Sequence, residues 1–324
     1  MQALSLADLE SAADIAYQVL SPTPQINWPL LSARCGNEVW VKHENHNPTG
    51  AFKVRGGLVY MSRLEQRDPD CPGVVTATRG NHGQSVALAA ARSGIPAVVV
   101  VPHGNSASKN SAMEALGCEL VVHGQDFDES AAHAARLAKK RNLHRMPSFH
   151  LDLVAGVASY ALEFLRSNPT LERVYVPIGL GSGICGMISA RNALQLSTEI
   201  IGVVSSEARC YQKSLAAGHC VNTDSANTLA DGMAVRVPNA EALQMMSGNV
   251  AEIVAVSDEE VLQAMSCFFH DTHNVAEGAG AAAGSRGAGG RRAQAAPAPG
   301  PLNHSPQEAA SASGVPRHYL DLAP

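Results

Sequence analysis

A lysine in an unusual position is the residue of this 324-residue chain most suited to covalent chemistry. Lys53 follows a tight turn at Pro48–Gly50 and the aromatic Phe52, and it stands where a helix is expected to begin. Helix N-termini favour negative charge, so an ammonium group there is slightly unfavourable. Formation of an imine with a carbonyl cofactor, which is how lysine serves pyridoxal phosphate (PLP) enzymes, changes that chemistry. The alternative at this point is an ordinary surface lysine in the first turn of a helix.

A glycine-rich run at Gly179–Gly186 is the second candidate, and it follows an expected strand and opens an expected helix. Glycines let successive backbone N–H groups converge on one point, and the helix N-terminus adds positive potential there. Such a cradle binds an anion, most often phosphate. It is not a Walker A loop, because no Gly-Lys-Ser/Thr follows. A dinucleotide site stays open, since Glu199 or Glu207 could be its acidic residue, and so does a flexible turn without a ligand.

The segment Thr78–Gln84 is the third candidate, and it also lies between an expected strand and an expected helix. Backbone amides at such a turn can hold a carboxylate. The side-chain amide of Asn81 can hydrogen-bond a phenolic oxygen, and it is equally suited to cap the helix that follows.

The elements that must position these segments alternate regularly, with short β-branched runs between alanine-rich helical stretches. Ala97–Val101 is wholly apolar, which is typical of a buried strand, and Ser257–Glu260 is a capping box that opens a helix. Such alternation predicts an α/β fold with parallel sheets covered on both faces, in which ligands bind beyond the carboxyl ends of the strands. The expected strands are 38–42, 74–77, 97–101, 119–122, 173–177, 200–204 and 252–256.

Composition limits the possible partners. The formal net charge of −5 gives no basic surface for nucleic acid. No apolar run approaches the roughly 20 residues that span a bilayer, so no membrane contact is expected. Seven scattered cysteines without a Cys-x-x-Cys pair, and an N-terminus without a secretory pattern, predict a cytoplasmic protein with reduced thiols.

Together, Thr49–Lys53, Thr78–Gln84 and Gly179–Gly186 resemble, in order and spacing, the lysine, asparagine-loop and glycine-loop motifs of fold-type II PLP enzymes. The resemblance is greatest to the threonine/serine dehydratase and serine racemase family, and it runs from Leu20 to Ala283. It implies two parallel-sheet α/β domains of the tryptophan synthase β-like kind, with PLP in the cleft between them. The implied small domain spans residues 52–151, and the large PLP-binding domain spans residues 1–51 plus 152–283.

By position, the resemblance implies a role for each motif residue. Lys53 forms the imine with the cofactor and later acts as base, Phe52 packs beside the pyridine ring, and Asn81 bonds the cofactor 3′-oxygen. The phosphate is held by backbone amides of the glycine loop, namely Gly179, Leu180, Gly181, Ser182 and Gly183, with a further bond from the Ser182 hydroxyl. The substrate α-carboxylate is received by Thr78, Arg79, Gly80 and His82. Arg79 either pairs with a second acid group on the substrate or points to solvent.

Departures from the family pattern concern metal binding and the end of the chain. Glu207 matches the first acid of the cation site that some relatives have, but the segment for the second acid is shortened. The histidine pairs at 43/46 and 270/273 have no third ligand, so no metal is expected. Nothing after Ala283 resembles the strand and turn that face the pyridine nitrogen in this family. Because Gly, Ala, Arg and Pro dominate after Gly284, residues 284–324 are predicted to be an atypical, disordered tail that leaves a core strand missing.

The activity implied by the resemblance is α,β-elimination from a β-hydroxy amino acid, threonine or serine, to a 2-oxo acid and ammonia. A racemase, or an ammonia-lyase for hydroxyaspartate or a diamino acid, shares the same motifs. Two further alternatives are an inactive chain that retains PLP binding despite its altered end, and a phosphate-ligand binding module in which Lys53 is dispensable. The expected partner is a small amino-acid substrate, and the resemblance suggests a homodimer or homotetramer.

Overall fold

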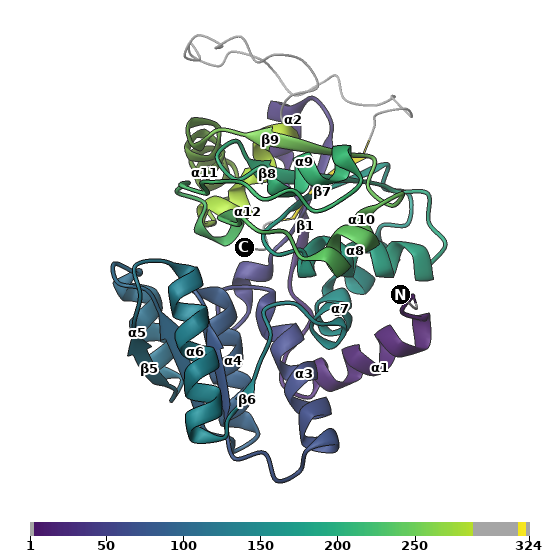
Figure 1. Cartoon of the computed structure of the whole chain (residues 1–324). Coiled ribbons are helices and arrows are strands. Elements are labelled where there is room, and N and C mark those ends of the chain that lie inside the picture. Colours follow the sequence, from purple (N-terminus) through teal and green to yellow (C-terminus); the bar gives the residue numbers. More distant parts are fainter. Residues whose placement is uncertain (1–2, 288–316, 322–324) are drawn as a thin grey trace.

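Two separate sheets organise the chain, and Figure 1 shows the larger one above the smaller one. The computed structural model describes residues 3–287 and 317–321. The larger sheet has six strands in the order β1-β2-β10-β7-β8-β9, and the smaller has four in the order β5-β4-β3-β6. We call the small sheet with helices α4, α5 and α6 the small unit. The large sheet with α8 to α12 and the short helix η2 is the large unit.

All neighbouring strands are parallel except β1, which runs antiparallel to β2. This arrangement confirms the predicted α/β class with parallel sheets. The strands of the large sheet are β1 (Gln25–Asn27), β2 (Glu38–Lys42), β7 (Arg173–Pro177), β8 (Glu199–Ser205), β9 (Glu252–Val256) and β10 (Arg317–Asp321). Those of the small sheet are β3 (Val74–Ala77), β4 (Ala97–Val101), β5 (Glu119–Val122) and β6 (His144–Arg145).

The core of the small unit explains why its strands could be predicted. All five residues of β4 are buried, as are all four of β3, and the two strands pair in register from Val74↔Ala97 to Ala77↔Val100. A parallel sheet covered on both faces requires such unbroken apolar runs.

The helices begin and end largely where side chains or glycines satisfy their terminal groups. The predicted capping box at Ser257 is present at the start of α11, and Asp126 caps α6, whose last turn carries three basic residues that suit the helix dipole. The helices are α1 (Leu6–Tyr17), α2 (Pro29–Cys35), η1 (Glu44–His46), α3 (Lys53–Arg67), α4 (Asn81–Arg92), α5 (Ala107–Ala115), α6 (Phe127–Arg141), α7 (Leu151–Ser167), α8 (Ser182–Ala193), α9 (Cys210–Ala217), η2 (Asp231–Met233), α10 (Ala240–Met246), α11 (Asp258–Thr272), α12 (Gly278–Ala282) and α13 (Gly284–Gly287).

Helix α7 joins the two units. It packs against α3 on one side and against α8 and α1 on the others, and it lies between the two sheets in Figure 1. Most of its residues are buried, including Tyr160 and Phe164, which belong to the largest apolar cluster. Helices α3 and α8, which begin at Lys53 and at the glycine loop, therefore both pack against α7.

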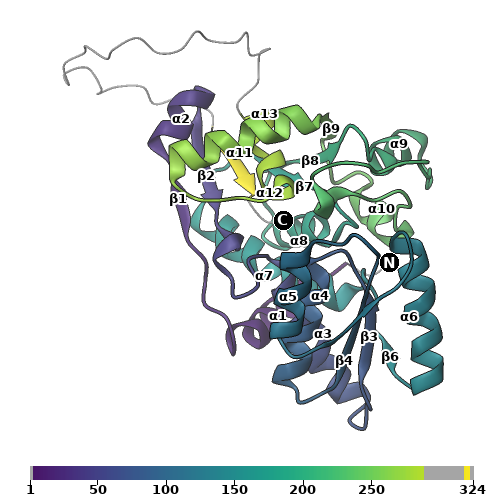
Figure 2. The same cartoon turned by 90° about the vertical axis from the view of Figure 1, so that its left-hand side faces the viewer.

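The end of the chain corrects one prediction. Strand β10 fills the position between β2 and β7, so the expectation that a core strand is missing is wrong for the backbone (Figure 2). It pairs in parallel with β2 from Arg317↔Glu38 to Asp321↔Lys42, and with β7 at three positions. The physical reason is that the inner edges of β2 and β7 need partners for their N–H and C=O groups, and this short segment supplies them. The remaining tail residues, 288–316 and 322–324, lie outside the described residues.

The strands of the small sheet all fall within residues 52–151, and those of the large sheet fall outside that range. The exact domain boundaries stay a prediction. Within the described ranges, none of the helices has the length and apolar character needed to cross a membrane.

Candidate active site

The three sequence motifs meet around Phe52 and Lys53, where α3 begins. The Nζ atom of Lys53 lies 4.6 Å from the centroid of the Phe52 ring. A Cβ atom on Gly183 would lie 3.2 Å from Cζ of Phe52, so the ring packs directly on the start of α8. Burial, and after it the Lys53 charge, lowers the pKa of His82 to about 4, which places Lys53 near the third motif. The fold thus brings residues from three distant segments together.

The helices that begin at these motifs have free N-terminal ends. No side chain caps α3, α4 or α8, and the same holds for α2, α9 and α12, whereas α1, α5, α6, α7, α10 and α11 each have a capping side chain. The first N–H groups of a helix have no partner inside the helix and attract anions. Two of these ends, at α4 and α8, are the places where the sequence predicted a carboxylate and a phosphate.

The glycine loop owes its shape to two positions that allow no side chain. Gly181 has φ of +110°, and a Cβ atom there would lie 2.8 Å from Cβ of Ala242. A Cβ atom on Gly179 would lie 2.2 Å from the carbonyl oxygen of Gly232. Leu180 and Ser182 are half-buried, and Ser182 is the first residue of α8. The loop therefore presents backbone to its surroundings, as a phosphate cradle requires.

Tyr211 holds this loop in place, and sequence reasoning did not identify it. Its hydroxyl donates to the Leu180 carbonyl at 2.7 Å and accepts from the Asn239 N–H at 2.9 Å. Burial raises the pKa of this phenol above its ordinary value, so the hydroxyl stays a donor. A buried tyrosine 31 residues from the loop leaves no local signal in the sequence.

Asn81 is the first residue of α4 and does not act as its N-cap. The N-cap position is Gly80, and the Asn81 side chain instead donates from Nδ2 to Oε1 of Glu277 at 2.9 Å. The side-chain amide thus points out of the small unit toward the large one.

The other residues of the Thr78–Gln84 segment differ in burial and in their contacts. Thr78 is buried, and its Oγ1 accepts from the Gly80 N–H at 3.0 Å. The His82 ring lies 3.2 Å from Oγ1 of Thr76, and with its lowered pKa it is neutral near pH 7. Arg79 is exposed. That this loop receives a carboxylate stays a prediction, and the neutral His82 would contribute polarity rather than charge.

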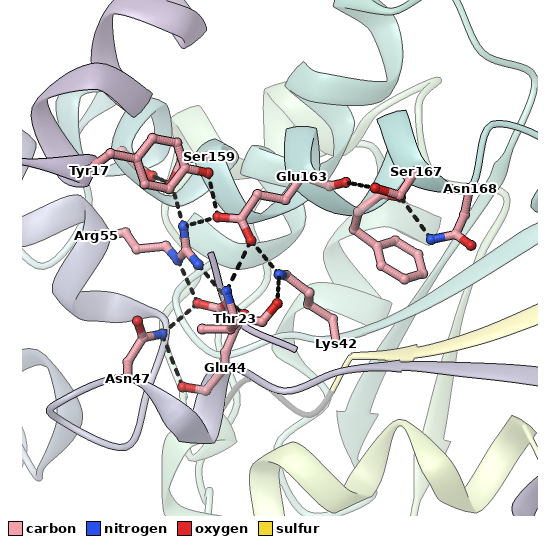
Figure 3. Close-up of polar contacts among 12 residues, drawn as sticks. Tyr17, Thr23, Lys42, Glu44, Asn47, Arg55, Ser159, Glu163, Ser167 and Asn168 are labelled. Carbon is pink, nitrogen blue, oxygen red and sulfur yellow. Dashed lines mark hydrogen bonds and ion pairs between the residues drawn. The ribbon is translucent and has the colours of Figure 1, made fainter. Parts of the chain in front are cut away.

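The start of α3 is anchored by Arg55, which has no exposed surface (Figure 3). Its Nε and Nη2 atoms donate to the two carboxylate oxygens of Glu44 at 2.7 and 2.9 Å. Its Nη1 atom donates to Oγ of Ser159 at 3.0 Å and to Oε1 of Glu163 at 2.6 Å. Because Arg55 follows Lys53 by two residues, these contacts fix the helical turn that carries the lysine against η1 and α7.

Neighbouring side chains complete this buried network, as Figure 3 shows. Lys42 and the Tyr17 hydroxyl both donate to Glu163, while Thr23 and Asn47 donate to Glu44 at 2.6 and 2.7 Å. Two cations, Lys42 and Arg55, balance the two carboxylates. Such balance is what makes buried charges tolerable. The sequence contained one sign of this network: Arg55 is a second cation in the first turn of α3, where positive charge is disfavoured unless a partner compensates it.

The pKa values in the network follow from this pairing. Burial alone would raise the pKa of Glu44, but the Arg55 charge and its hydrogen bonds outweigh burial and hold that pKa below its ordinary value. Burial lowers the pKa of Lys42, against the opposing effect of Glu44 and Glu163.

Comparison with known proteins agrees with this geometry. The sequence matches the family model described as "Pyridoxal-phosphate dependent enzyme" over residues 17–296. The chain belongs to this family. Relatives more than 30% identical place it with the threonine dehydratases and ammonia-lyases of this family, and a solved serine racemase shares its fold. The cofactor predicted from the lysine and the glycine loop is therefore confirmed as the family's cofactor.

Two relatives and one solved structure illustrate the similarity. The biosynthetic L-threonine dehydratase of Pasteurella multocida is 33% identical over 266 residues, which are 82% of this chain and 52% of that protein. The L-threonine ammonia-lyase of Thermotoga maritima is 34% identical over 281 residues, which are 86% of this chain and 69% of that protein. The structure of maize serine racemase shares the fold, with a TM-score of 0.87 at 23% identity over 99% of this chain and 93% of its own. The chain thus spans about half the length of the first of these relatives.

The residues present fit PLP. The uncapped start of α8 and the glycine loop, in which Gly179 and Gly181 leave no room for side chains, suit its phosphate. Lys53 supplies an amine for its carbonyl, and the amide of Asn81 suits its phenolic oxygen.

Proposed function

We propose that this chain is a PLP-dependent ammonia-lyase that converts a β-hydroxy amino acid, threonine or serine, to a 2-oxo acid and ammonia. The observation that carries the proposal is the position of Lys53. It lies beside the Phe52 ring, which packs on the glycine loop, and its charge acts on His82 in the third motif. The threonine dehydratase and threonine ammonia-lyase relatives support elimination as the reaction.

The proposed roles follow from the chemistry of each group. Backbone N–H groups of Gly179–Gly183 and the start of α8 bind the phosphate. Asn81 donates to the phenolic oxygen, and the uncapped start of α4 binds the α-carboxylate of the substrate. Bound PLP supplies the electron sink for negative charge that develops at the substrate Cα. Lys53 would hold the cofactor through its Nζ atom, and the same amine, when free, would take the Cα proton of the substrate.

The overall reaction balances without an oxidant. The Cα–H and Cβ–O bonds break, the hydroxyl leaves as water, and the resulting enamine takes up water again as it hydrolyses to the 2-oxo acid and ammonia. A racemase would instead return the proton to the opposite face of Cα, and an inactive chain would only bind the cofactor. These alternatives differ in their products.

The test is the visible absorption spectrum of the purified protein with PLP, before and after borohydride. The wild type should show a visible band that borohydride abolishes. Mass spectrometry after this reduction should find the mass of the cofactor added to the peptide that contains Lys53. Lys53→Ala should lack the band, while Lys140→Ala, on the exposed face of α6, should keep it. A band that persists in Lys53→Ala would overturn the role of this lysine.

Product analysis then decides the reaction. Incubation of the PLP-loaded protein with L-threonine and L-serine should release a 2-oxo acid and equimolar ammonia. Formation of the opposite enantiomer without ammonia would identify a racemase. A stable band without either product would identify a chain that only binds the cofactor.

A further inference from the structure

A chain of polar contacts joins the small unit to the large unit beside the candidate site. Asn81 Nδ2 donates to Glu277 Oε1 at 2.9 Å, and Glu277 Oε2 lies 3.1 Å from Nζ of Lys109. The same Nζ atom donates to both carboxylate oxygens of Asp231, at 3.0 and 2.8 Å. Asn81 and Lys109 belong to α4 and α5 of the small unit, whereas Asp231 and Glu277 belong to η2 and the start of α12 in the large unit.

Lys109 packs directly on the predicted carboxylate loop. A Cβ atom on Gly80 would lie 2.5 Å from Cδ of Lys109 and 3.2 Å from its Nζ, so the lysine side chain lies directly against the backbone of Gly80. Burial alone would lower the pKa of Lys109, but Glu277 and Asp231 outweigh burial and raise that pKa. Lys109 is therefore charged and holds the Glu277 carboxylate in place. The Lys109 side chain is 17% exposed and that of Glu277 is 28% exposed.

The chemistry of Glu277 restricts the orientation of Asn81. An ionised carboxylate can only accept hydrogen bonds, whereas an amide side chain has a donating and an accepting end. With Glu277 as neighbour, Asn81 turns Nδ2 toward it and keeps Oδ1 away. The second N–H of Nδ2 then remains to donate elsewhere.

We propose that Glu277 is a positioning residue that fixes Asn81 as a hydrogen-bond donor for the phenolic oxygen of PLP. This inference rests on the role of Asn81 in the proposed function. Because Glu277 comes from the opposite unit, Asn81 is held in this orientation only when the two units lie together as they do here. The cofactor site is thus completed by a contact between the units.

A double-mutant cycle tests the proposal without using turnover. We would measure the PLP dissociation constant of Asn81→Ala, Glu277→Ala and the double variant by absorbance titration. Each single variant should bind PLP about tenfold more weakly, as expected for loss of one hydrogen bond to a charged group. Adding Glu277→Ala to Asn81→Ala should change the constant by less than about twofold, because Glu277 acts through Asn81.

The pH dependence of the visible band separates positioning from general structural support. An oxygen that loses its donor holds a nearby proton more tightly, so the pH midpoint of the band should rise in Asn81→Ala and equally in Glu277→Ala. Glu277→Gln permits both orientations of the Asn81 amide, so it should raise the pH midpoint of the band. Glu277→Asp keeps a carboxylate, so its midpoint should lie closer to the wild-type value. Asp231→Asn loses an ion pair of Lys109 but no direct contact of Asn81, so it should shift the midpoint less than Glu277→Ala does.

The outcomes distinguish this inference from the proposed function. If the wild type shows the Lys53-dependent band but the two variants act additively, or Glu277→Ala leaves the midpoint unchanged, the positioning role is overturned and the cofactor site stands. If the folded wild type shows no such band, the proposed function fails and the inference fails with it. Far-ultraviolet circular dichroism of each variant verifies that it is folded.

Discussion

Replacement of Arg55 by methionine should destabilise the protein strongly. Methionine keeps a stem of similar length but removes the four hydrogen bonds that Arg55 makes to Glu44, Ser159 and Glu163. Glu44 is completely buried and would keep the hydrogen bonds from Thr23 and Asn47 as compensation. Removing one partner of a buried pair costs about 3–5 kcal/mol, because an uncompensated charge remains in the interior. That is a large part of the roughly 5–15 kcal/mol by which a typical protein is stable.

The pH dependence gives this prediction a sign. In the wild type the pKa of Glu44 is lowered, so its contribution to stability is present above the ordinary value of 4.5 and is lost as the pH falls through the lowered pKa. Without Arg55, burial becomes the largest influence on the pKa of Glu44, opposed only by the Lys42 charge and the Thr23 hydrogen bond, so we expect that pKa to rise and the folded state to favour the protonated acid more than in the wild type. The stability difference between wild type and Arg55→Met should therefore shrink as the pH falls from about 7 to about 5.

The assay is urea unfolding followed by circular dichroism at several pH values. Arg141→Met is the matched control, because it removes an ion pair with Glu119 in which both side chains are well exposed, and it should change stability little. The reasoning is refuted if Arg55→Met is as stable as Arg141→Met at neutral pH. It is also refuted if the stability difference grows as the pH is lowered.

Three further predictions concern the site. Gly181→Ala should weaken PLP binding by more than about tenfold in a fluorescence titration, because the backbone has φ of +110° and the new Cβ atom meets Ala242. Gly36→Ala is the control, since Gly36 has φ of +66° with open space around it, and equal PLP binding by the two variants would contradict the prediction. Tyr211→Phe should lower the free energy of unfolding by about 0.5–1.5 kcal/mol in urea, since the half-buried Leu180 carbonyl and Asn239 N–H lose their partner, and an unchanged value would show that the loop needs no anchor. With its pKa lowered to about 4, His82 should be neutral and show no NMR titration between about pH 5.5 and pH 8 in the cofactor-free protein, whereas a midpoint at the ordinary 6.5 would be inconsistent with its burial.

Local patterns in the sequence were sufficient for most of the fold. The expected strands at 74–77, 97–101, 119–122, 173–177 and 252–256 coincide with β3, β4, β5, β7 and β9. For β3 and β4 the reason is burial on both faces, which requires unbroken apolar runs. The capping box at Ser257 was equally readable, since it is made by residues three positions apart. Lys53, Asn81 and the glycine loop could be chosen because each combines an unusual residue type with a strand-to-helix junction.

Short strands and long-range contacts could not be found in this way. β1 and β6 have three and two residues, too few to show a period, and β10 is a five-residue segment whose pairing depends on the open position between β2 and β7. Its sequence, Arg317–Asp321 in a Ser- and Pro-containing stretch near the end of the chain, gave no sign of that position.

The sequence by itself determined the fold class and the cofactor, and it predicted the residues that would carry the chemistry. Only the tertiary structure decided how those residues are held: Arg55 with the charges around it, Tyr211 on the glycine loop, and Glu277 on Asn81. Glu277 and Asn81 are 196 residues apart and lie in different units. Local propensity encodes the conformation of neighbouring residues, whereas these hydrogen bonds join residues far apart in the chain, within the large unit for Tyr211 and between the units for Asn81 and Glu277, which no short stretch of sequence specifies.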